Sequence, residues 1–246
     1  MSALLEVRNV CRTFRTTRAV DGVSFAVQPG ELVGLIGPNG AGKSTLFNLI
    51  AGVLAPASGD ILFDGKPVTG WKPHAVARAG VARTFQIPKP YRQLSVIENV
   101  MMSAFLRETS MAGARRLAES ILADVGLDAC GGASAATLTV GLLKRLEVAR
   151  ALATRPRLVL FDEIMAGLTP AEVGAMTEMV AGLPARGVTV IWVEHVLYAI
   201  MKTATRMIVL DRGRLIAEGE PATVARDPAV VKAYLGDDSG EETPLA

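Results

Sequence analysis

A glycine-rich segment that joins an apolar run to a helical one constrains this 246-residue chain more than any other feature. The apolar run is residues 32–36, the segment is Gly37-Pro38-Asn39-Gly40-Ala41-Gly42-Lys43-Ser44-Thr45, and residues 46–50 continue from it. Such a strand, turn and helix present backbone N–H groups, the positive end of a helix dipole and one lysine to an anion. In the pattern G-x-x-x-x-G-K-[ST], the lysine reaches the β- and γ-phosphates of a nucleotide and the hydroxyl ligates Mg²⁺. The sequence therefore predicts a nucleotide-phosphate site in which Lys43 and Ser44 have these roles.

The composition agrees with a nucleotide-binding protein and argues against several other classes. A formal net charge of +2 is too small to indicate nucleic acid as the main partner. Cys11 and Cys130 lie far apart and match no metal or redox spacing, so we interpret them as free thiols. The N-terminus lacks the pattern of a signal peptide, and no uncharged, glycine-poor run approaches the ~18 apolar residues that a membrane helix needs.

The rest of the chain alternates between segments that predict strands and segments that predict helices. Strands are expected at residues 4–10, 20–27, 32–36, 60–63, 81–85, 158–163, 188–193, 206–211 and 214–217. Further helices are expected at residues 72–79, 96–107, 114–125 and 142–152, after Pro170 and at residues 221–235. Residues 13–18 are expected to form a polar turn, and Ser95 with Glu98 has the pattern of a capping box. This order of elements predicts an α/β fold.

One helix-rich block interrupts the alternation and suggests how the chain is divided. Residues 95–154 are predicted to form an inserted helical subdomain. Residues 1–94 and 155–235 would then form the nucleotide-binding core together with a β subdomain. The remaining residues, 236–246, are acidic and small, which predicts a disordered tail.

A second apolar run, which begins at Leu158, ends in Asp162 and Glu163. A strand that delivers an aspartate to the mouth of a sheet places it where it can hold the hydration shell of Mg²⁺. The next carboxylate, Glu163, would lie where an attacking water sits and could orient or deprotonate it. The competing interpretation is that both carboxylates only cap the helical region at Pro170.

Two further polar residues follow predicted strands: Gln86 begins the proline-containing loop after residues 81–85, and His195 follows residues 188–193. Each is unremarkable alone, but the carboxyl ends of parallel strands form the ligand-binding edge of such sheets. The glycine-rich segment, Gln86, residues 138–145, the two carboxylates and His195 therefore occur in one order along the chain. With these motifs in this order, the chain resembles the ATP-binding subunits of ABC transporters over nearly its whole length, to residue 235.

The resemblance implies a P-loop NTPase fold of the ABC cassette type, with an N-terminal antiparallel β region and an inserted helical subdomain. In that family two cassettes sandwich two ATP molecules head to tail. By carry-over, Phe14 stacks on the adenine and His195 contacts the γ-phosphate. Gln86 takes part in catalysis and in Mg²⁺ ligation with Ser44 and Asp162, and couples the site to a transmembrane partner. The N–H groups of Thr139 and Gly141 face the ATP of the opposite subunit.

The finer similarity is to importer subunits for branched-chain amino acids, through residues 81–86, 96–100, 166–170 and 227–236. It implies transmembrane permease subunits, a second ATPase subunit in a homodimer or heterodimer, and indirectly an extracytoplasmic solute-binding protein. It also implies a peripheral position on the cytoplasmic face of the inner membrane. Amides and urea remain alternative solutes, because an ATPase of this architecture does not touch its cargo.

The segment Thr139-Val140-Gly141-Leu142 departs from the Ser-Gly-Gly-Gln of the usual signature motif, and Ile164 and Thr169 replace the usual proline and aspartate. These departures predict weaker contacts between the two cassettes. Two other classes remain as alternatives: a soluble ABC-type ATPase of DNA maintenance or translation, and a small-molecule phosphotransferase. The first would need a coiled coil or a second cassette, and the residues between Lys43 and Asp162 hold no sustained heptads.

Overall fold

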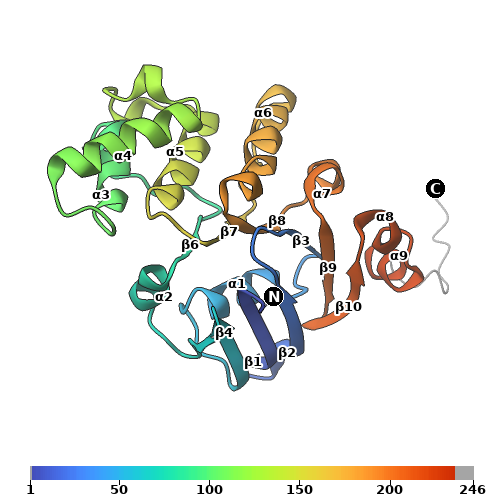
Figure 1. Ribbon diagram of the computed structural model, residues 1–246. Coiled ribbons are helices and arrows are strands. Elements are labelled where there is room, and N and C mark those ends of the chain that lie inside the picture. The colour runs from blue at the N-terminus through green and yellow to red at the C-terminus, as the bar shows by residue number, and fades with distance from the viewer. Residues whose placement is uncertain (1, 236–246) are drawn as a thin grey trace.

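The computed structural model describes residues 2–235, and the strands in this range form two sheets (Figure 1). The antiparallel sheet has the strand order β2-β1-β4-β5, from β1 (Leu5–Phe14), β2 (Thr17–Val27), β4 (Ser58–Phe63) and β5 (Lys66–Pro67). The larger sheet has the order β10-β9-β3-β8-β7-β6, from β3 (Leu32–Ile36), β6 (Val81–Arg83), β7 (Leu158–Asp162), β8 (Thr189–Val193), β9 (Arg206–Asp211) and β10 (Arg214–Gly219). The mixed α/β architecture is as predicted.

The central strands β3, β7 and β8 of the larger sheet are buried along their whole length, which explains why they are almost continuous apolar runs. Its strands β6, β7, β8, β3 and β9 are parallel, and β10 pairs antiparallel with β9. Along β3, Leu32 and Ile36 pack into one hydrophobic cluster while Val33 and Leu35 pack into another. Strands β7, β8 and β9 alternate in the same way, because successive side chains point to opposite faces.

The helices cover these two faces unequally (Figure 1). Helix α1 (Lys43–Ile50) packs in the cluster shared by both sheets, while α3, α4, α5 and α6 pack with the opposite face. Helices α3 to α5 contact one another and lie together on one side of the molecule. Their bounds and those of the remaining helices are α2 (Pro73–Ala79), α3 (Val96–Ala104), α4 (Met111–Asp124), α5 (Val140–Leu152), α6 (Pro170–Ala181), α7 (Leu197–Thr203), α8 (Pro221–Val224) and α9 (Pro228–Leu235), with short 3-10 helices at Asp128–Cys130, Ala135–Thr137 and Pro184–Arg186.

Several local predictions are confirmed. Ser95 caps α3, and its hydroxyl accepts from the backbone N–H of Glu98, whose carboxylate in turn accepts from the N–H of Ser95. Both cysteines are free, as interpreted from their spacing. Among residues 2–235, no helix combines the length and the apolar character of a membrane span.

Other local predictions are wrong. Residues 13–18 are not all turn, because the β1–β2 hairpin runs on and leaves only Arg15 and Thr16 between its strands. The helix predicted for residues 221–235 is two helices, because Pro228 cannot continue a helix and starts α9 instead. The predicted strand over residues 81–85 ends at Arg83. Helix α7 was not predicted; it has seven residues and no side-chain cap.

The division of the chain into an ATP-binding core and a helical subdomain at residues 95–154 stays a prediction. The predicted disordered tail, residues 236–246, lies outside the described residues.

Candidate functional site

The glycine-rich segment lies between β3 and α1, as its sequence pattern predicts. Lys43, the first residue of α1, is 7% exposed, and its Nζ donates to the carbonyl oxygens of Gly37 at 2.6 Å and Pro38 at 3.0 Å. Burial lowers the pKa of Lys43, against the opposing effect of the Glu163 and Asp162 carboxylates. The carbonyl oxygens of the loop therefore hold the ammonium group of Lys43 near the carboxylates of Asp162 and Glu163.

Two glycines make this loop possible. Gly37 has φ 151° and Gly42 has φ 104°, both in a region that L side chains rarely adopt. A Cβ at Gly37 would lie 2.1 Å from the carbonyl oxygen of Leu210, and one at Gly42 would lie 2.2 Å from that of Ala19. The loop thus packs directly against backbone, and any side chain at either position would displace it.

The loop encloses a cavity of about 200 Å³. Its described lining consists of Ala19, Asn39, Gly40, Ala41, Gly42, Lys43, Ser44, Thr45 and Glu163. A lysine, two hydroxyls and the N-terminus of α1 converge there, which is the donor set that a phosphate chain requires.

Glu163 is where the predicted catalytic residues meet. Its Oε2 accepts from the Nε2 of Gln86 at 2.5 Å, and its Oε1 lies 3.0 Å from the Nε2 of His195. Glu163 follows β7 directly with φ 49°, a left-handed conformation that is uncommon for a residue with a side chain. Gln86 and His195 lie far from Glu163 in the sequence, and the fold brings all three side chains into contact at the end of the sheet.

Asp162 has a partner that the sequence analysis missed. Its Oδ2 accepts from the Nη2 of Arg83 at 2.8 Å, and Arg83 also donates to the Oδ1 of Asn48 on α1 at 2.5 Å. The aspartate is only 5% exposed, so this ion pair is nearly dry. A signal was present, because an arginine inside an apolar strand requires a buried acceptor.

Ser44 and Asp162 offer the kind of ligands that Mg²⁺ takes. This ion is usually held by one or two protein oxygens, with phosphate oxygens and waters completing its octahedron. Ser44 is part of the lining of the loop cavity, and Asp162 is the last residue of β7. Within residues 2–235 there is no group of three or more His, Cys, Asp or Glu side chains arranged for a metal. The roles of Ser44, Asp162 and Gln86 as Mg²⁺ ligands stay predictions.

Two more buried charged residues, Lys144 and Glu194, lie near Glu163, and neither was named as a site residue from the sequence. Lys144, on α5, is 3% exposed, and its Nζ donates to the backbone oxygens of Gln86 at 2.5 Å and Glu163 at 3.0 Å. Burial lowers the pKa of Lys144, against the pull of nearby carboxylates. Glu194 accepts from the backbone N–H of Met165 at 2.9 Å, and burial raises its pKa.

The residues predicted to serve an opposite subunit or the adenine lie apart from this cluster. Thr139 caps α5, and its hydroxyl accepts from the N–H of Leu142 at 3.4 Å. Gly141 packs so closely on Glu172 that a Cβ would lie 2.1 Å from its Oε1. Phe14, at the end of β1, is 42% exposed and does not belong to the described lining of the loop cavity. The roles predicted for Phe14, Thr139 and Gly141 remain untested by this single chain.

Comparison with known proteins agrees with this geometry. The family model described as ABC transporter matches residues 20–166, and one described as branched-chain amino acid ATP-binding cassette transporter matches residues 214–239. The chain is 35% identical over 250 residues to the high-affinity branched-chain amino acid transport ATP-binding protein BraF of Pseudomonas aeruginosa, covering 95% of this chain and 98% of BraF. It is 34% identical over 237 residues to the lipopolysaccharide export system ATP-binding protein LptB of Acidithiobacillus ferridurans, covering 96% and 98%.

The solved structures give the same family. An ATP-binding cassette of an ABC transporter, in its ADP conformation, superposes with a TM-score of 0.86 and 32% sequence identity, covering 96% of this chain and 100% of that one. The chain belongs to the ABC transporter family. It is an ATP-hydrolysing subunit of that family, with the cassette fold that the sequence predicted.

Proposed function

We propose that this chain hydrolyses ATP to power the import of branched-chain amino acids through separate membrane subunits. The observation that carries the choice of solute is the match of residues 214–239 to the branched-chain amino acid cassette model, together with the similarity to BraF. The LptB protein is nearly as similar but is named for lipopolysaccharide export. Import of amides or urea is the other alternative, and uptake measurements separate these solutes.

Binding of ATP would rest on the loop cavity. Lys43 supplies the positive charge for the β- and γ-phosphates, and the backbone N–H groups of Gly40 and Gly42 supply neutral donors. Ser44 and Asp162 would hold Mg²⁺, which, when bound, neutralises charge on the phosphate oxygens. Arg83 donates to one oxygen of the buried Asp162 carboxylate at 2.8 Å and so fixes its direction.

Hydrolysis would rest on Glu163. Its carboxylate borders the loop cavity, where it can accept the proton of a water that attacks the γ-phosphate. The side chains of Gln86 and His195 hold its two oxygens at 2.5 and 3.0 Å. Both contacts fix the direction of the carboxylate, and His195 would in addition contact the γ-phosphate.

The second ATPase subunit would complete each site. We propose that the start of α5, with Thr139 and Gly141, faces the ATP of the opposite cassette, while Phe14 stacks on the adenine of its own. Val140 is 55% exposed at this surface, where the usual signature motif has glycine. A partner cassette with a more typical signature would compensate, which favours a heterodimer.

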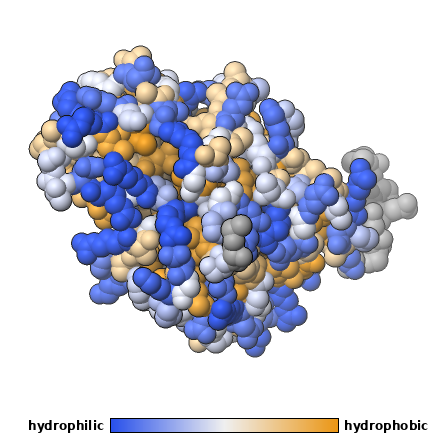
Figure 2. Space-filling model, in the orientation of Figure 1, coloured by the Kyte–Doolittle hydropathy of each residue, from blue (hydrophilic) through white to orange (hydrophobic). Residues whose placement is uncertain are grey.

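The permease subunits would dock beside the loop that starts at Gln86. Three large apolar side chains there are exposed: Phe85 by 48%, Ile87 by 73% and Tyr91 by 48%. A neighbouring cavity of about 250 Å³ lies between α2, β6 and α5 and includes Val53 and Phe85 in its lining. Hydrophobic surface is also visible among polar residues over α3 and α4 (Figure 2). Such a patch fits a helix from a membrane subunit, with Tyr91 as an anchor.

The chain would then lie peripherally on the cytoplasmic face of the inner membrane, linked only indirectly to a solute-binding protein.

We expect the isolated chain to be a weak ATPase and its rate to rise by about tenfold or more when it is reconstituted with its membrane subunits, because the docked helix would order the Gln86 loop. Steady-state phosphate release should be compared for the chain alone and for the assembled complex. Co-purification with the tagged chain identifies those subunits. Full activity of the isolated chain, independent of solute and partners, would contradict the proposal and favour a soluble enzyme.

A further inference from the structure

One face of α5 holds the loop that follows β6. Lys144, Glu147 and Arg150 are spaced three residues apart, so they lie along the same side of the helix. Lys144 donates to the backbone oxygen of Gln86 at 2.5 Å, and Glu147 accepts from the Nη1 of Arg150 at 2.9 Å. Arg150 donates to the backbone oxygen of Lys89 at 2.9 Å. The loop is therefore bound to α5 through its backbone at two points, Gln86 and Lys89.

Lys144 differs from Glu147 and Arg150 because it also contacts Glu163, the residue that directly follows β7. Its Nζ lies 3.0 Å from the backbone oxygen of Glu163, while it lies 2.5 Å from that of Gln86. The backbone of Glu163 is in the left-handed region, so the direction of its side chain depends on how this peptide is held. One ammonium group thus connects α5, the loop and the proposed base.

Nearby carboxylates offset part of the cost of burying the positive charge of Lys144. The side chain is 3% exposed, and an isolated buried cation would be costly. Burial still lowers the pKa of Lys144, but Glu194, Glu163, Glu147 and Asp162 all favour its charged form and oppose part of that effect. An ammonium group also donates in several directions at once, which lets it serve two carbonyl oxygens from different elements.

We propose that Lys144 is a positioning residue for Glu163, and that it transmits displacements of the Gln86 loop to that carboxylate. This inference rests on the proposed function, because it assigns Glu163 as the base. The same helix begins with Thr139, at the surface proposed to face the opposite ATP. Movement of α5 would therefore change the base of its own site and the contact with the neighbouring site together.

The test uses the full chain with Mg²⁺ and ATP. Lys144→Met removes the charge and both hydrogen bonds but keeps an unbranched side chain of similar length. We expect kcat to fall on the order of 10-fold or more, while the Kd for ATP measured by calorimetry changes less than about twofold. Lys144→Arg should recover most of the lost rate, because it retains a buried cation with several donors.

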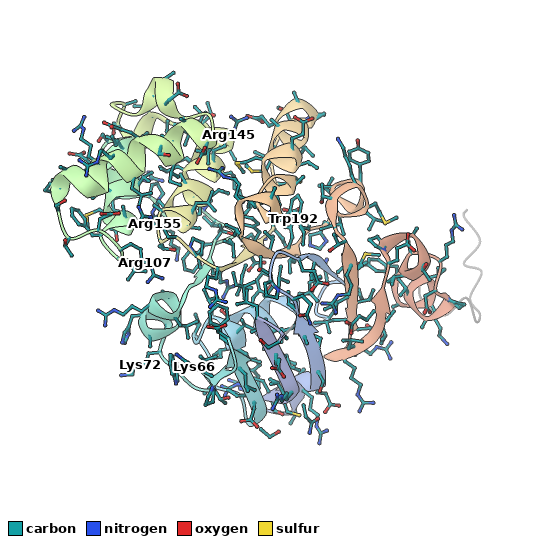
Figure 3. The ribbon with its side chains drawn as sticks, viewed as in Figure 1. Lys66, Lys72, Arg107, Arg145, Arg155 and Trp192 are labelled. Atoms are coloured by element: carbon teal, nitrogen blue, oxygen red, sulfur yellow. The ribbon has the colours of Figure 1, made fainter. Side chains whose placement is uncertain are left out.

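Arg145→Met is the matched control, since Arg145 is the next residue of α5 (labelled in Figure 3) and its Nη1 donates instead to the backbone oxygen of Val125 at 3.3 Å. It removes the same charge from the same helix and should leave kcat within about twofold of the parent. Thermal unfolding of each variant shows whether it is folded. If Lys144→Met does not fold, Lys144→Gln replaces it, because the amide can still donate one hydrogen bond.

A double variant separates positioning from a merely structural role. If Lys144 acts through Glu163, then Lys144→Met should slow single-turnover hydrolysis no further in a Glu163→Gln background. An equal additional loss in that background would overturn the inference, as would a folded Lys144→Met variant with unchanged kcat. Failure of the proposed role of Glu163 looks different, because the Glu163→Gln variant alone would then turn over ATP nearly as fast as the parent chain.

Discussion

Replacement of Glu163 by glutamine is expected to lower kcat for ATP hydrolysis by about 10²–10⁴-fold and to leave the Kd for ATP within about twofold. The amide has the shape of the carboxylate but cannot accept the proton of the attacking water. The glutamine can still contact Gln86 and His195, whose distances to the carboxylate are 2.5 and 3.0 Å, so the site should stay assembled. Phosphate release gives kcat, and calorimetry gives the affinity.

Glu178→Gln is the control for this variant, because Glu178 is an exposed carboxylate on α6. It should leave kcat and the Kd for ATP unchanged.

The Glu163→Gln variant should also accumulate as an ATP-bound dimer, since hydrolysis normally opens the dimer of two cassettes. Near-normal turnover of a folded Glu163→Gln variant would mean that another group is the base.

Replacement of Lys43 by alanine is expected to weaken ATP binding by about 2–5 kcal/mol, the range for truncating one partner of a buried charge contact. The variant loses the one cation in the described lining of the loop cavity. It also loses the two hydrogen bonds through which Lys43 holds the carbonyl oxygens of Gly37 and Pro38. Calorimetric titration with ATP measures the effect.

The control is Lys202→Ala, because Lys202 is exposed on α7 and lies outside the described lining of that cavity. This variant should bind ATP like the parent. Circular dichroism and thermal unfolding verify that Lys43→Ala is folded. Unchanged affinity in a folded Lys43→Ala variant would refute the assignment of the phosphate site.

Local signals account for most of what the sequence predicted. The glycine-rich loop, the capping box at Ser95 and the apolar strand before Asp162 each depend on neighbouring residues, and the structure has all three. The meeting of Gln86 and His195 at Glu163 depends on the order of the parallel strands, which was not predicted; the family resemblance supplied only the roles of these residues. Local patterns were misleading at the β1–β2 hairpin, where polar residues form strand because a partner strand pairs with them.

The parts that sequence reasoning missed depend on tertiary contacts. Arg83 and Asn48 join Asp162 from two different elements, and Lys144 joins two backbone oxygens from two others. Backbone acceptors have no sequence signature, so a lysine that serves them looks like a surface residue of a helix. Trp192 is fully buried at the centre of the molecule (Figure 3) and donates to Glu194. This partner of a buried carboxylate was likewise not predictable from the neighbouring sequence.

Solute uptake by the assembled transporter tests the central claim most directly. Proteoliposomes would contain this chain, its co-purified membrane subunits and its solute-binding protein, with ATP on the side of the chain. We predict ATP-dependent accumulation of labelled leucine, isoleucine or valine that is lost with Glu163→Gln, and no accumulation of urea or amides. Uptake that is unaffected by Glu163→Gln, or an assembled complex that hydrolyses ATP but accumulates none of the three amino acids, would contradict the account.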